Sequence, residues 1–375
     1  SHLSVIIITT QCFAPKIGGI ESLMTGMADA MSKNGKDILV LADGAENKAD
    51  KKANYKIKRF SGWKPIRRIK KALYLEKLCK NKTVETIYAD SWKSVEYVRK
   101  QNKKILVLAH GTEIPKQYWG VMLDILRFKK NRIINSYKNV FKIIANSNYT
   151  RDLMNASLKI DFERIKIIHP GIDIYEDFIS QVDEENVKKI IKNRQPIIST
   201  LARVEERKGH KFIINAISKL TDRFPNLIYL IAGKGPYLEE IKKYVNKLSL
   251  ENHVVFLGWI TEPEKSLVLK NSEVFAMTPT TVGESVEGFG MAFIDAAFHG
   301  IPSVGSRSGG ISDAIIEEET GLLAEAGNQE EITKKLTKLL DDAELRTKLG
   351  KRGKEIAEKH YSWDNKIIEY LEAAN

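Results

Sequence analysis

Short runs rich in β-branched and other apolar residues alternate with longer helical patterns, and this alternation occurs twice along the chain. The runs are residues 5–10, 37–42, 86–90, 105–110 and 142–146 in the first half, and 196–204, 227–232, 254–258, 274–280 and 301–305 in the second. Runs that are apolar throughout and separated by helical patterns are typical of buried parallel strands in βαβ units. Two such series predict an α/β fold with two doubly wound, Rossmann-like domains.

The boundary between the two series indicates where each domain begins and ends. A chain of 375 residues exceeds one ordinary core. We expect a first domain at residues 1–172, a charged connector at 173–195 where the strong pattern lapses, and a second domain at 196–356. The amphipathic segment 357–375 is expected to pack back onto the first domain.

The cysteines and the hydropathy of the sequence indicate the cellular compartment in which we expect the protein. The two cysteines, Cys12 and Cys79, lie far apart in sequence, and the chain shows no secretory signal. These features favour a reducing cytoplasm. No apolar run approaches the roughly 20 residues that span a bilayer, so we expect a soluble or peripheral protein.

The positive charge is confined to the first half of the chain. Residues 1–150 hold 29 lysines and arginines against 12 acids, whereas residues 151–375 hold 31 against 36. The excess concentrates in segment 64–78, which follows Trp63. Four apolar residues of this segment fall roughly on one helical face: Ile66, Ile69, Leu73 and Leu78. An anionic membrane surface and an ordinary surface helix explain the pattern equally well. Nucleic acid is disfavoured because aromatic residues are not interleaved with the charge.

Ligands of open α/β sheets bind beyond the carboxyl ends of the strands, so residues that follow each run are candidates. Gly18 and Gly19 follow the first run and can expose backbone N–H groups beside a helix start. His110 ends the fourth run, and Gly233 and Lys234 follow the run at 227–232. Each of these patterns also occurs in ordinary strand-to-helix turns, so none is specific alone.

Arg203 lies at the end of the first run of the second series, and Lys208 follows that run. Two fixed cations can neutralise a diphosphate as it leaves, a task that enzymes often give to a metal ion. No Asp-x-Asp pair exists in the sequence to hold such a metal. We therefore expect cationic assistance with no metal and no cofactor.

The segment from Ser285 to Asp295 joins two acids to a glycine-rich turn. Its central residues are Glu287, Gly288, Phe289, Gly290 and Met291. The glycines allow a tight turn before a helix whose first N–H groups can bind an anion, and the Glu287 carboxylate can accept hydrogen bonds from sugar hydroxyls. The segment predicts a sugar-phosphate site, with a plain loop before a core helix as the alternative.

Together these motifs resemble the retaining family-4 glycosyltransferases of the GT-B fold, in which two domains face a central cleft. Residues 15–21 resemble the glycine-rich loop of the family, 110–113 its cleft histidine and 145–151 the end of its first sheet. Residues 202–210 resemble its Arg/Lys diphosphate pair, and 287–295 its two acids separated by seven residues. The chain looks most similar to bacterial members that modify lipids or polysaccharide precursors, such as phosphatidylinositol-mannoside mannosyltransferases.

The resemblance implies a role for each candidate residue. Glu287 would contact the donor sugar, and the backbone after it would hold sugar hydroxyls and phosphate. Asp295 would bind the nucleotide ribose, although the family normally has the longer Glu at this position. Arg203 and Lys208 would stabilise the departing diphosphate. His110 would lie near the donor sugar and acceptor, and Gly19 would close over phosphate.

The sequence thus predicts a retaining, metal-independent transferase that moves a hexose from a UDP- or GDP-sugar. The acceptor would be a lipid or glycan precursor at the cytoplasmic membrane face, and the anionic membrane surface is an expected partner. One alternative is a nucleotide-sugar 2-epimerase on a similar two-domain fold. Another is a non-catalytic sugar-nucleotide or membrane binding module, which the cation pair and both motif acids disfavour.

Overall fold

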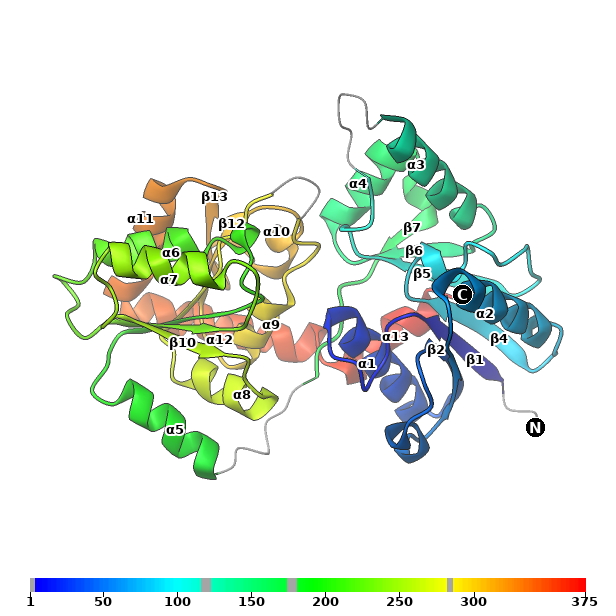
Figure 1. The fold of residues 1–375 in the computed structure, drawn as a ribbon, viewed down its shortest axis with the longest axis horizontal. Helices are drawn as coiled ribbons and strands as arrows, with labels where there is room; N and C mark the ends of the chain where they lie inside the picture. Colours follow the sequence, from blue (N-terminus) through cyan, green and yellow to red (C-terminus); the bar gives the residue numbers. More distant parts are fainter. Residues whose placement is uncertain (1–3, 116–122, 174–180, 282–285) are drawn as a thin grey trace. The chain divides into compact units, whose positions relative to one another are not determined.

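The computed structural model of the chain describes residues 4–115, 123–173, 181–281 and 286–375. It divides into two compact units, residues 1–173 with 361–375 and residues 174–360 (Figure 1). Ser285 and part of the expected connector, residues 174–180, lie outside the described residues.

The first unit is built on a parallel sheet with helices on both faces (Figure 1). Its strands are β1 (Val5–Thr10), β2 (Asp37–Asp43), β3 (Lys56–Phe60), β4 (Val84–Ala89), β5 (Lys104–Ala109), β6 (Lys142–Ala145) and β7 (Ile165–Ile167). They lie in the order β3-β2-β1-β4-β5-β6-β7. The helices are α1 (Gly19–Lys33), α2 (Lys64–Cys79), α3 (Leu123–Tyr137), α4 (Asn148–Leu158) and α13 (Trp363–Glu372), with short turns η1 (Lys48–Lys52), η2 (Trp92–Ser94) and η3 (Phe162–Arg164).

The second unit repeats the plan with its own parallel sheet, in the order β10-β9-β8-β11-β12-β13. Its strands are β8 (Ile197–Leu201), β9 (Ile228–Ala232), β10 (Val254–Gly258), β11 (Val274–Ala276), β12 (Ser303–Arg307) and β13 (Gly321–Glu325). Its helices are α5 (Gln181–Ile191), α6 (His210–Ser218), α7 (Leu238–Lys247), α8 (Glu262–Lys270), α9 (Met291–Phe298), α10 (Ile311–Ala314), α11 (Gln329–Asp341) and α12 (Ala343–His360), with the short turn η4 (Glu206–Lys208). The prediction of two doubly wound parallel sheets is confirmed.

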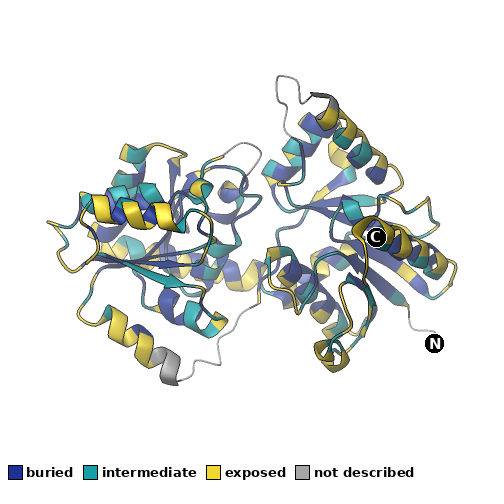
Figure 2. Cartoon of the chain, viewed as in Figure 1, coloured by how far each residue is buried: buried dark blue, intermediate teal, exposed yellow. Residues whose placement is uncertain are grey.

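Burial on both faces explains why the predicted runs became strands. In β1, Ile7 belongs to one apolar cluster, whereas Ile6 and Ile8 belong to the cluster on the other face of the sheet. Successive side chains of a strand point to opposite faces, so a strand covered on both sides must be apolar at every position. Figure 2 shows this as buried strands beneath helices whose outward faces are exposed.

The C-terminal helix α13 packs against α1 within the first unit. Gly26 of α1 faces the Trp363 indole so closely that a Cβ atom at this position would overlap the ring. The Tyr88 hydroxyl of β4 donates a hydrogen bond of 2.7 Å to the Tyr370 carbonyl oxygen. The end of the chain is therefore part of the first core, and α12 before it belongs to the second unit.

Helix α2 has the predicted exposed apolar residues but fewer free cations than its sequence implied. Three apolar residues of its outer face and the preceding tryptophan are exposed: Trp63 (73%), Ile66 (47%), Ile69 (43%) and Leu73 (55%). Leu78 instead packs against the core. Lys71 is 2% exposed, and its ammonium group donates to Asp43 Oδ1 at 2.7 Å and to the Thr10 carbonyl oxygen at 2.9 Å. Lys71 is thus a buried structural residue.

No helix within the described parts of the chain is both long enough and apolar enough to cross a membrane.

Candidate functional site

Hydrogen bonds tie together the loops that follow three strands of the second unit. The Gly233 N–H, just after β9, donates to the Gly258 carbonyl oxygen at 2.7 Å, and the Val204 N–H, after β8, donates to the Lys234 carbonyl oxygen at 3.0 Å. Gly233 has a φ of +124°, and a Cβ atom there would overlap the Ala202 carbonyl group. Only glycine allows this close approach of two loops at the carboxyl edge of the sheet.

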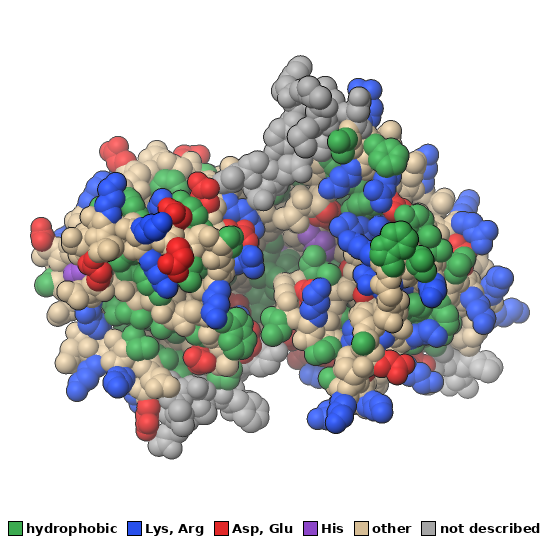
Figure 3. Space-filling view, viewed as in Figure 1, with side chains coloured by type: hydrophobic (Ala, Val, Ile, Leu, Met, Phe, Trp, Pro, Cys, Tyr) green, Lys and Arg blue, Asp and Glu red, His purple; other side chains and the backbone are tan. Residues whose placement is uncertain are grey.

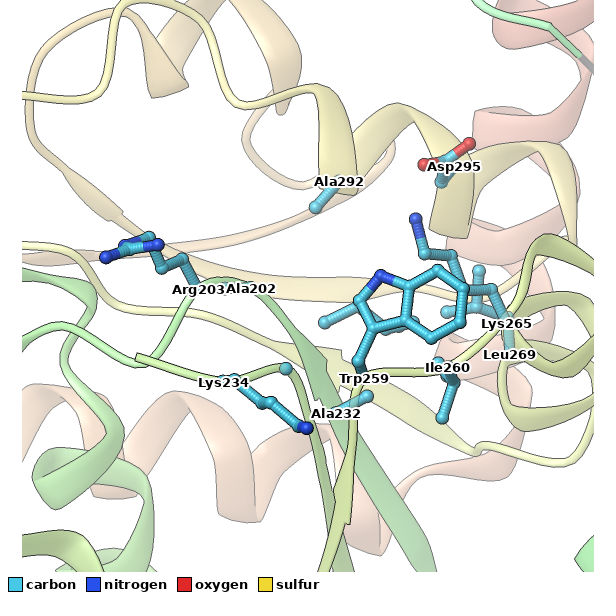
Figure 4. Close-up of a pocket in the computed structure, with 12 residues that line it drawn as sticks. Ala202, Arg203, Ala232, Lys234, Trp259, Ile260, Lys265, Leu269, Ala292 and Asp295 are labelled. Carbon is cyan, nitrogen blue, oxygen red and sulfur yellow. The ribbon is translucent and has the colours of Figure 1, made fainter. Parts of the chain in front are cut away.

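A cavity of about 400 Å³ lies at this edge, entirely within the second unit. Four of the predicted site residues line it: Arg203, Gly233, Lys234 and Asp295. Figure 4 shows Arg203 toward one end of the cavity and Asp295 toward the other, with Trp259 between them. Asp295 lies on α9, one turn from its first residue, and Ala292 of the same helix also lines the cavity.

Trp259 is a site residue that the sequence analysis missed. It directly follows β10, and its side chain is 60% exposed although it lines the cavity. An exposed indole at a strand end offers a flat surface on which an aromatic base can stack. Its position immediately after a predicted strand was the signal that could have revealed it.

Glu287 is held by two cations. Its Oε2 atom accepts hydrogen bonds from Lys208 Nζ at 2.7 Å and from Arg207 Nη1 at 2.9 Å. All three side chains are largely buried, between 11% and 16% exposed. Burial alone would raise the pKa of the Glu287 carboxyl, but the charges of Lys208 and Arg207 outweigh it and hold the pKa below its ordinary value. The carboxylate is therefore ionised at neutral pH.

The loop after β8 brings these cations to Glu287. The Thr280 N–H donates to the Arg207 carbonyl oxygen at 2.7 Å, and the Thr278 hydroxyl donates to the Gly209 carbonyl oxygen at 3.3 Å. Gly209 has a φ of +79°, and a Cβ atom there would overlap Thr278. These contacts fix the η4 turn against the segment that follows β11.

The two cations of the predicted pair, Arg203 and Lys208, contact different carboxylates. Lys208 binds Glu287, whereas Arg203 is 67% exposed at the cavity and its Nε atom lies 2.7 Å from Glu205 Oε1. Arg207, which the sequence analysis passed over, is the second cation at Glu287 and also contacts Glu205 at 3.2 Å.

The glycine-rich turn leads into α9, and none of residues 288–291 is among the described residues that line the cavity. Gly290 has a φ of +96° and precedes α9, which begins at Met291. Phe289 is 3% exposed and Gly290 is also buried, whereas Gly288 is half-buried. The Gly310 N–H donates to the Glu287 carbonyl oxygen at 2.8 Å. This hydrogen bond fixes the turn against the loop that follows β12, and α9 begins directly after the turn.

The remaining candidates lie in the first unit. The Nε2 atom of His110, at the end of β5, lies 2.6 Å from the Asp90 carbonyl oxygen. A carbonyl oxygen only accepts hydrogen bonds, so Nε2 carries the proton and Nδ1 is left as an acceptor. Gly19 opens α1 with free space beside its Cα atom, whereas Gly18 lies against the Glu21 carboxylate.

Within the described residues, no group of three or more His, Cys, Asp or Glu side chains is arranged to hold a metal ion. Cys12 and Cys79 are both free thiols, and burial raises the pKa of the Cys12 thiol to about 12 and that of Cys79 to about 11.

Two parallel-sheet, Rossmann-like domains with such a strand-end site define the GT-B class of glycosyltransferases, and solved structures agree. The Anabaena protein HepE in complex with UDP matches with a TM-score of 0.78 and 18% identity over 99% of this chain and 100% of its own. Sucrose-phosphate synthase from Thermosynechococcus elongatus matches with a TM-score of 0.78 and 17% identity over 98% of each chain.

Family models identify the chain more narrowly. Residues 17–176 match the model described as Glycosyltransferase Family 4, and residues 181–356 match Glycosyl transferases group 1. A relative from Mycolicibacterium smegmatis, described as a GDP-mannose-dependent alpha-(1-6)-phosphatidylinositol monomannoside mannosyltransferase, is 26% identical over 96% of this chain and 95% of its own. A D-inositol 3-phosphate glycosyltransferase from Corynebacterium glutamicum is 28% identical over 57% of this chain and 51% of its own. The chain belongs to glycosyltransferase family 4.

Proposed function

We propose that this enzyme is a retaining, metal-independent hexosyltransferase that uses a nucleoside diphosphate sugar as donor. The cavity that Arg203, Trp259 and Asp295 line, with Arg203 toward one end, Asp295 toward the other and Trp259 between them, is the observation on which the proposal rests. It brings together an aromatic surface, a carboxylate and a cation, the three kinds of group that would bind the base, the ribose and the diphosphate of a nucleotide.

The base would stack on the Trp259 indole, a contact that contributes about 1–3 kcal/mol. The Asp295 carboxylate would accept hydrogen bonds from the ribose hydroxyls, directly or through a water molecule because the side chain is short. Arg203, Lys234 and the backbone around Gly233 lie where they can meet the diphosphate. Gly290 and Met291, at the start of α9, would add N–H groups and the positive end of the helix dipole.

Charge neutralisation would come from side chains. Lys208 already lies beside an ionised carboxylate in the free enzyme. A diphosphate that gains negative charge as it leaves would draw Lys208 toward itself, with Arg203 supporting it from the cavity side. Glu287 would then be able to accept hydrogen bonds from the hydroxyls of the donor sugar. A metal ion and a cofactor are unnecessary in this scheme.

Retention of anomeric configuration is part of the same proposal. Glu287 is ionised and already accepts two charge-assisted hydrogen bonds. Such a carboxylate is a poor proton donor, so it suits a contact with the sugar better than general acid catalysis. The acceptor hydroxyl would attack from the face that the diphosphate leaves and would pass its proton to that phosphate. By the resemblance to the family, we assign His110 and the loop around Gly18 and Gly19 to the acceptor side of the reaction.

For the acceptor we propose a lipid or glycan precursor at the cytoplasmic membrane face. The curated relatives named above act on a phosphatidylinositol mannoside and on inositol phosphate. Trp63 and the exposed apolar side chains of α2 would insert among lipid headgroups, with the flanking lysines and arginines attracted to anionic lipid. Figure 3 shows many Lys and Arg side chains together with exposed hydrophobic groups on the first unit.

Thermal unfolding with a panel of UDP- and GDP-sugars tests the donor. A ligand at one hundred times its Kd stabilises the folded state by about 2.7 kcal/mol, which raises Tm. We expect one nucleotide family to stabilise the protein without added metal. If no nucleotide sugar raises Tm or reacts, the proposal is wrong.

A further inference from the structure

Hydrogen bonds join the loops that follow four adjacent strands of the first sheet, β1, β4, β5 and β6. The Gln11 N–H, after β1, donates to Asp90 Oδ2, after β4, at 2.9 Å. The Asp90 carbonyl oxygen lies 2.6 Å from Nε2 of His110, after β5. Asn146, after β6, donates from Nδ2 to the His110 carbonyl oxygen at 3.1 Å. His110 is therefore held by the loops on both sides of its own strand.

These contacts occupy three of the four polar groups of His110. Its N–H donates to Glu113 Oε1 at 2.7 Å, its carbonyl oxygen accepts from Asn146, and its Nε2 donates to the Asp90 carbonyl oxygen. Among the described residues, none forms a hydrogen bond with His110 Nδ1. With the proton on Nε2, Nδ1 can only accept a hydrogen bond. The half-buried ring thus offers a substrate one polar atom, which needs a donor as its partner.

The two residues that hold His110 are themselves fixed. Asp90 is 2% exposed, and its carboxylate also accepts a hydrogen bond from Ser94 Oγ. A carbonyl oxygen only accepts, so the Asn146 amide must present Nδ2 to His110. Its Oδ1 then accepts from Oγ1 of the fully buried Thr150 at 2.6 Å. Rotation of either side chain would therefore break a further hydrogen bond.

We propose that Asp90 and Asn146 are positioning residues, which hold His110 so that Nδ1 accepts a hydrogen bond from a substrate hydroxyl group. This inference rests on the proposed transferase function and adds the residues that orient its histidine. The partner is a hydroxyl because sugars and their acceptors carry this donor. An ionised phosphate or carboxylate only accepts hydrogen bonds and would not pair with Nδ1.

Asn146→Asp tests the positioning in the full chain. The change keeps the shape of the side chain, but a carboxylate cannot donate to the His110 carbonyl oxygen and repels it. We expect kcat to fall by roughly 10- to 100-fold, because a misplacement of about 1 Å can cost that much. KM for the donor should change little, because the donor cavity lies within the second unit. Asn146→Ala adds no charge and should lower kcat as well.

Asn155→Asp is the matched control. Asn155 Nδ2 donates to the Ile160 carbonyl oxygen at 3.0 Å, and Asn155 is half-buried, as Asn146 is. The control therefore loses the same kind of hydrogen bond in the same unit without touching the contacts of His110. We expect a fall in Tm similar to that of Asn146→Asp, with an unchanged kcat.

Nitrogen NMR of isotope-labelled histidine reports the positioning without catalysis. The ring signals of His110 are identified by their loss in His110→Gln. We expect wild type in mildly alkaline solution to carry the proton on Nε2 and none on Nδ1. In Asn146→Asp the signals of the two ring nitrogens should become more alike as the tautomers mix, whereas Asn155→Asp should match wild type.

Two reactions identify the source of the hydroxyl: hydrolysis of UDP-glucose or GDP-mannose without acceptor, and transfer to phosphatidylinositol vesicles. A fall in both indicates a hydroxyl of the donor sugar, and a fall in transfer alone indicates an acceptor hydroxyl. Equal kcat values for Asn146→Asp and Asn155→Asp in every reaction that wild type catalyses overturn this inference alone. A wild-type His110 protonated at Nδ1 overturns it too. A wild type that turns over no nucleotide sugar overturns the transferase proposal as well, so wild-type activity distinguishes the two failures.

Discussion

Replacement of Glu287 by Gln keeps the size of the side chain and removes its charge. Lys208 Nζ and Arg207 Nη1 then lose the carboxylate oxygen that lies 2.7 and 2.9 Å from them. Loss of one partner from a fully buried ion pair costs roughly 3–5 kcal/mol. These side chains retain 11–16% exposure, and the amide oxygen still accepts one hydrogen bond. We therefore expect a loss of about 2 kcal/mol, discounted for solvent screening.

Thermal unfolding of wild type and variant measures this loss. For a unit of this size, about 2 kcal/mol corresponds to a fall in Tm of roughly 4–8 °C. Glu205→Gln is the matched control, because Glu205 is 29% exposed and Arg203, one of its two cation partners, is 67% exposed. The control should cost less than about 1 kcal/mol. It differs from the test in the greater exposure of the carboxylate and of one of its cation partners.

The pH dependence gives an independent check on the same ion pairs. The folded pKa of Glu287 lies below its unfolded value of about 4.3. Its contribution to stability is therefore full above that pH and is lost as the pH falls through the folded pKa. The Tm difference between wild type and Glu287→Gln should shrink in acid. Equal Tm values at pH 7, or a difference that persists unchanged in strong acid, would refute the reasoning.

Three further predictions follow from single side chains. Trp259→Ala should raise the Kd for the donor nucleotide by roughly 5- to 150-fold with little change in Tm, because the exposed indole contributes stacking and not core packing. Calorimetry measures this Kd, and an unchanged value would show that Trp259 does not bind the nucleotide. Burial and the Lys208 charge lower the pKa of His210 to about 4. The free energy of unfolding of the wild type should therefore fall by up to about 3 kcal/mol as the pH falls from 6.5 toward 4. Denaturant unfolding should show that the free energy of unfolding of His210→Phe lacks this dependence on pH. The same pH dependence in wild type and variant would contradict the assignment. Gly26→Val should lower the Tm of the first unit by displacing Trp363, and an unchanged Tm would show that α13 does not depend on this contact.

The central strands were predictable because burial on both faces leaves only apolar residues. The missed strands lie at or near sheet edges or are very short. β3 at one edge has the sequence Lys-Ile-Lys-Arg-Phe, with charges between its apolar residues, and β7 at the other edge has three residues. β13 at the edge of the second sheet contains one short apolar stretch after a glycine. Edge strands bury less surface, so their sequences are less constrained.

Site residues could be predicted where their position near a strand end indicated the site. They could not be predicted where the packing of two loops determined which side chain they contact. Arg203, Gly233 and Asp295 line one cavity as strand-end reasoning allows. Arg207 was missed because its contact with Glu287 depends on a backbone hydrogen bond between distant loops. Lys71 belongs to the basic segment 64–78, but its ammonium group is buried against Asp43, the last residue of β2, which is distant in sequence. The sequence shows that a side chain is charged, but it does not show whether the folded protein exposes that side chain to solvent or pairs it with a buried acid.

The anomeric configuration of the first sugar product tests the account most directly. We would incubate the enzyme with the stabilising nucleotide sugar in the presence of EDTA and follow the anomeric protons by NMR from the first turnovers. The account predicts a transferred or hydrolysed sugar with the configuration of the donor, formed at the same rate with and without EDTA. An inverted product, an epimerised donor or a reaction that stops in EDTA would contradict it.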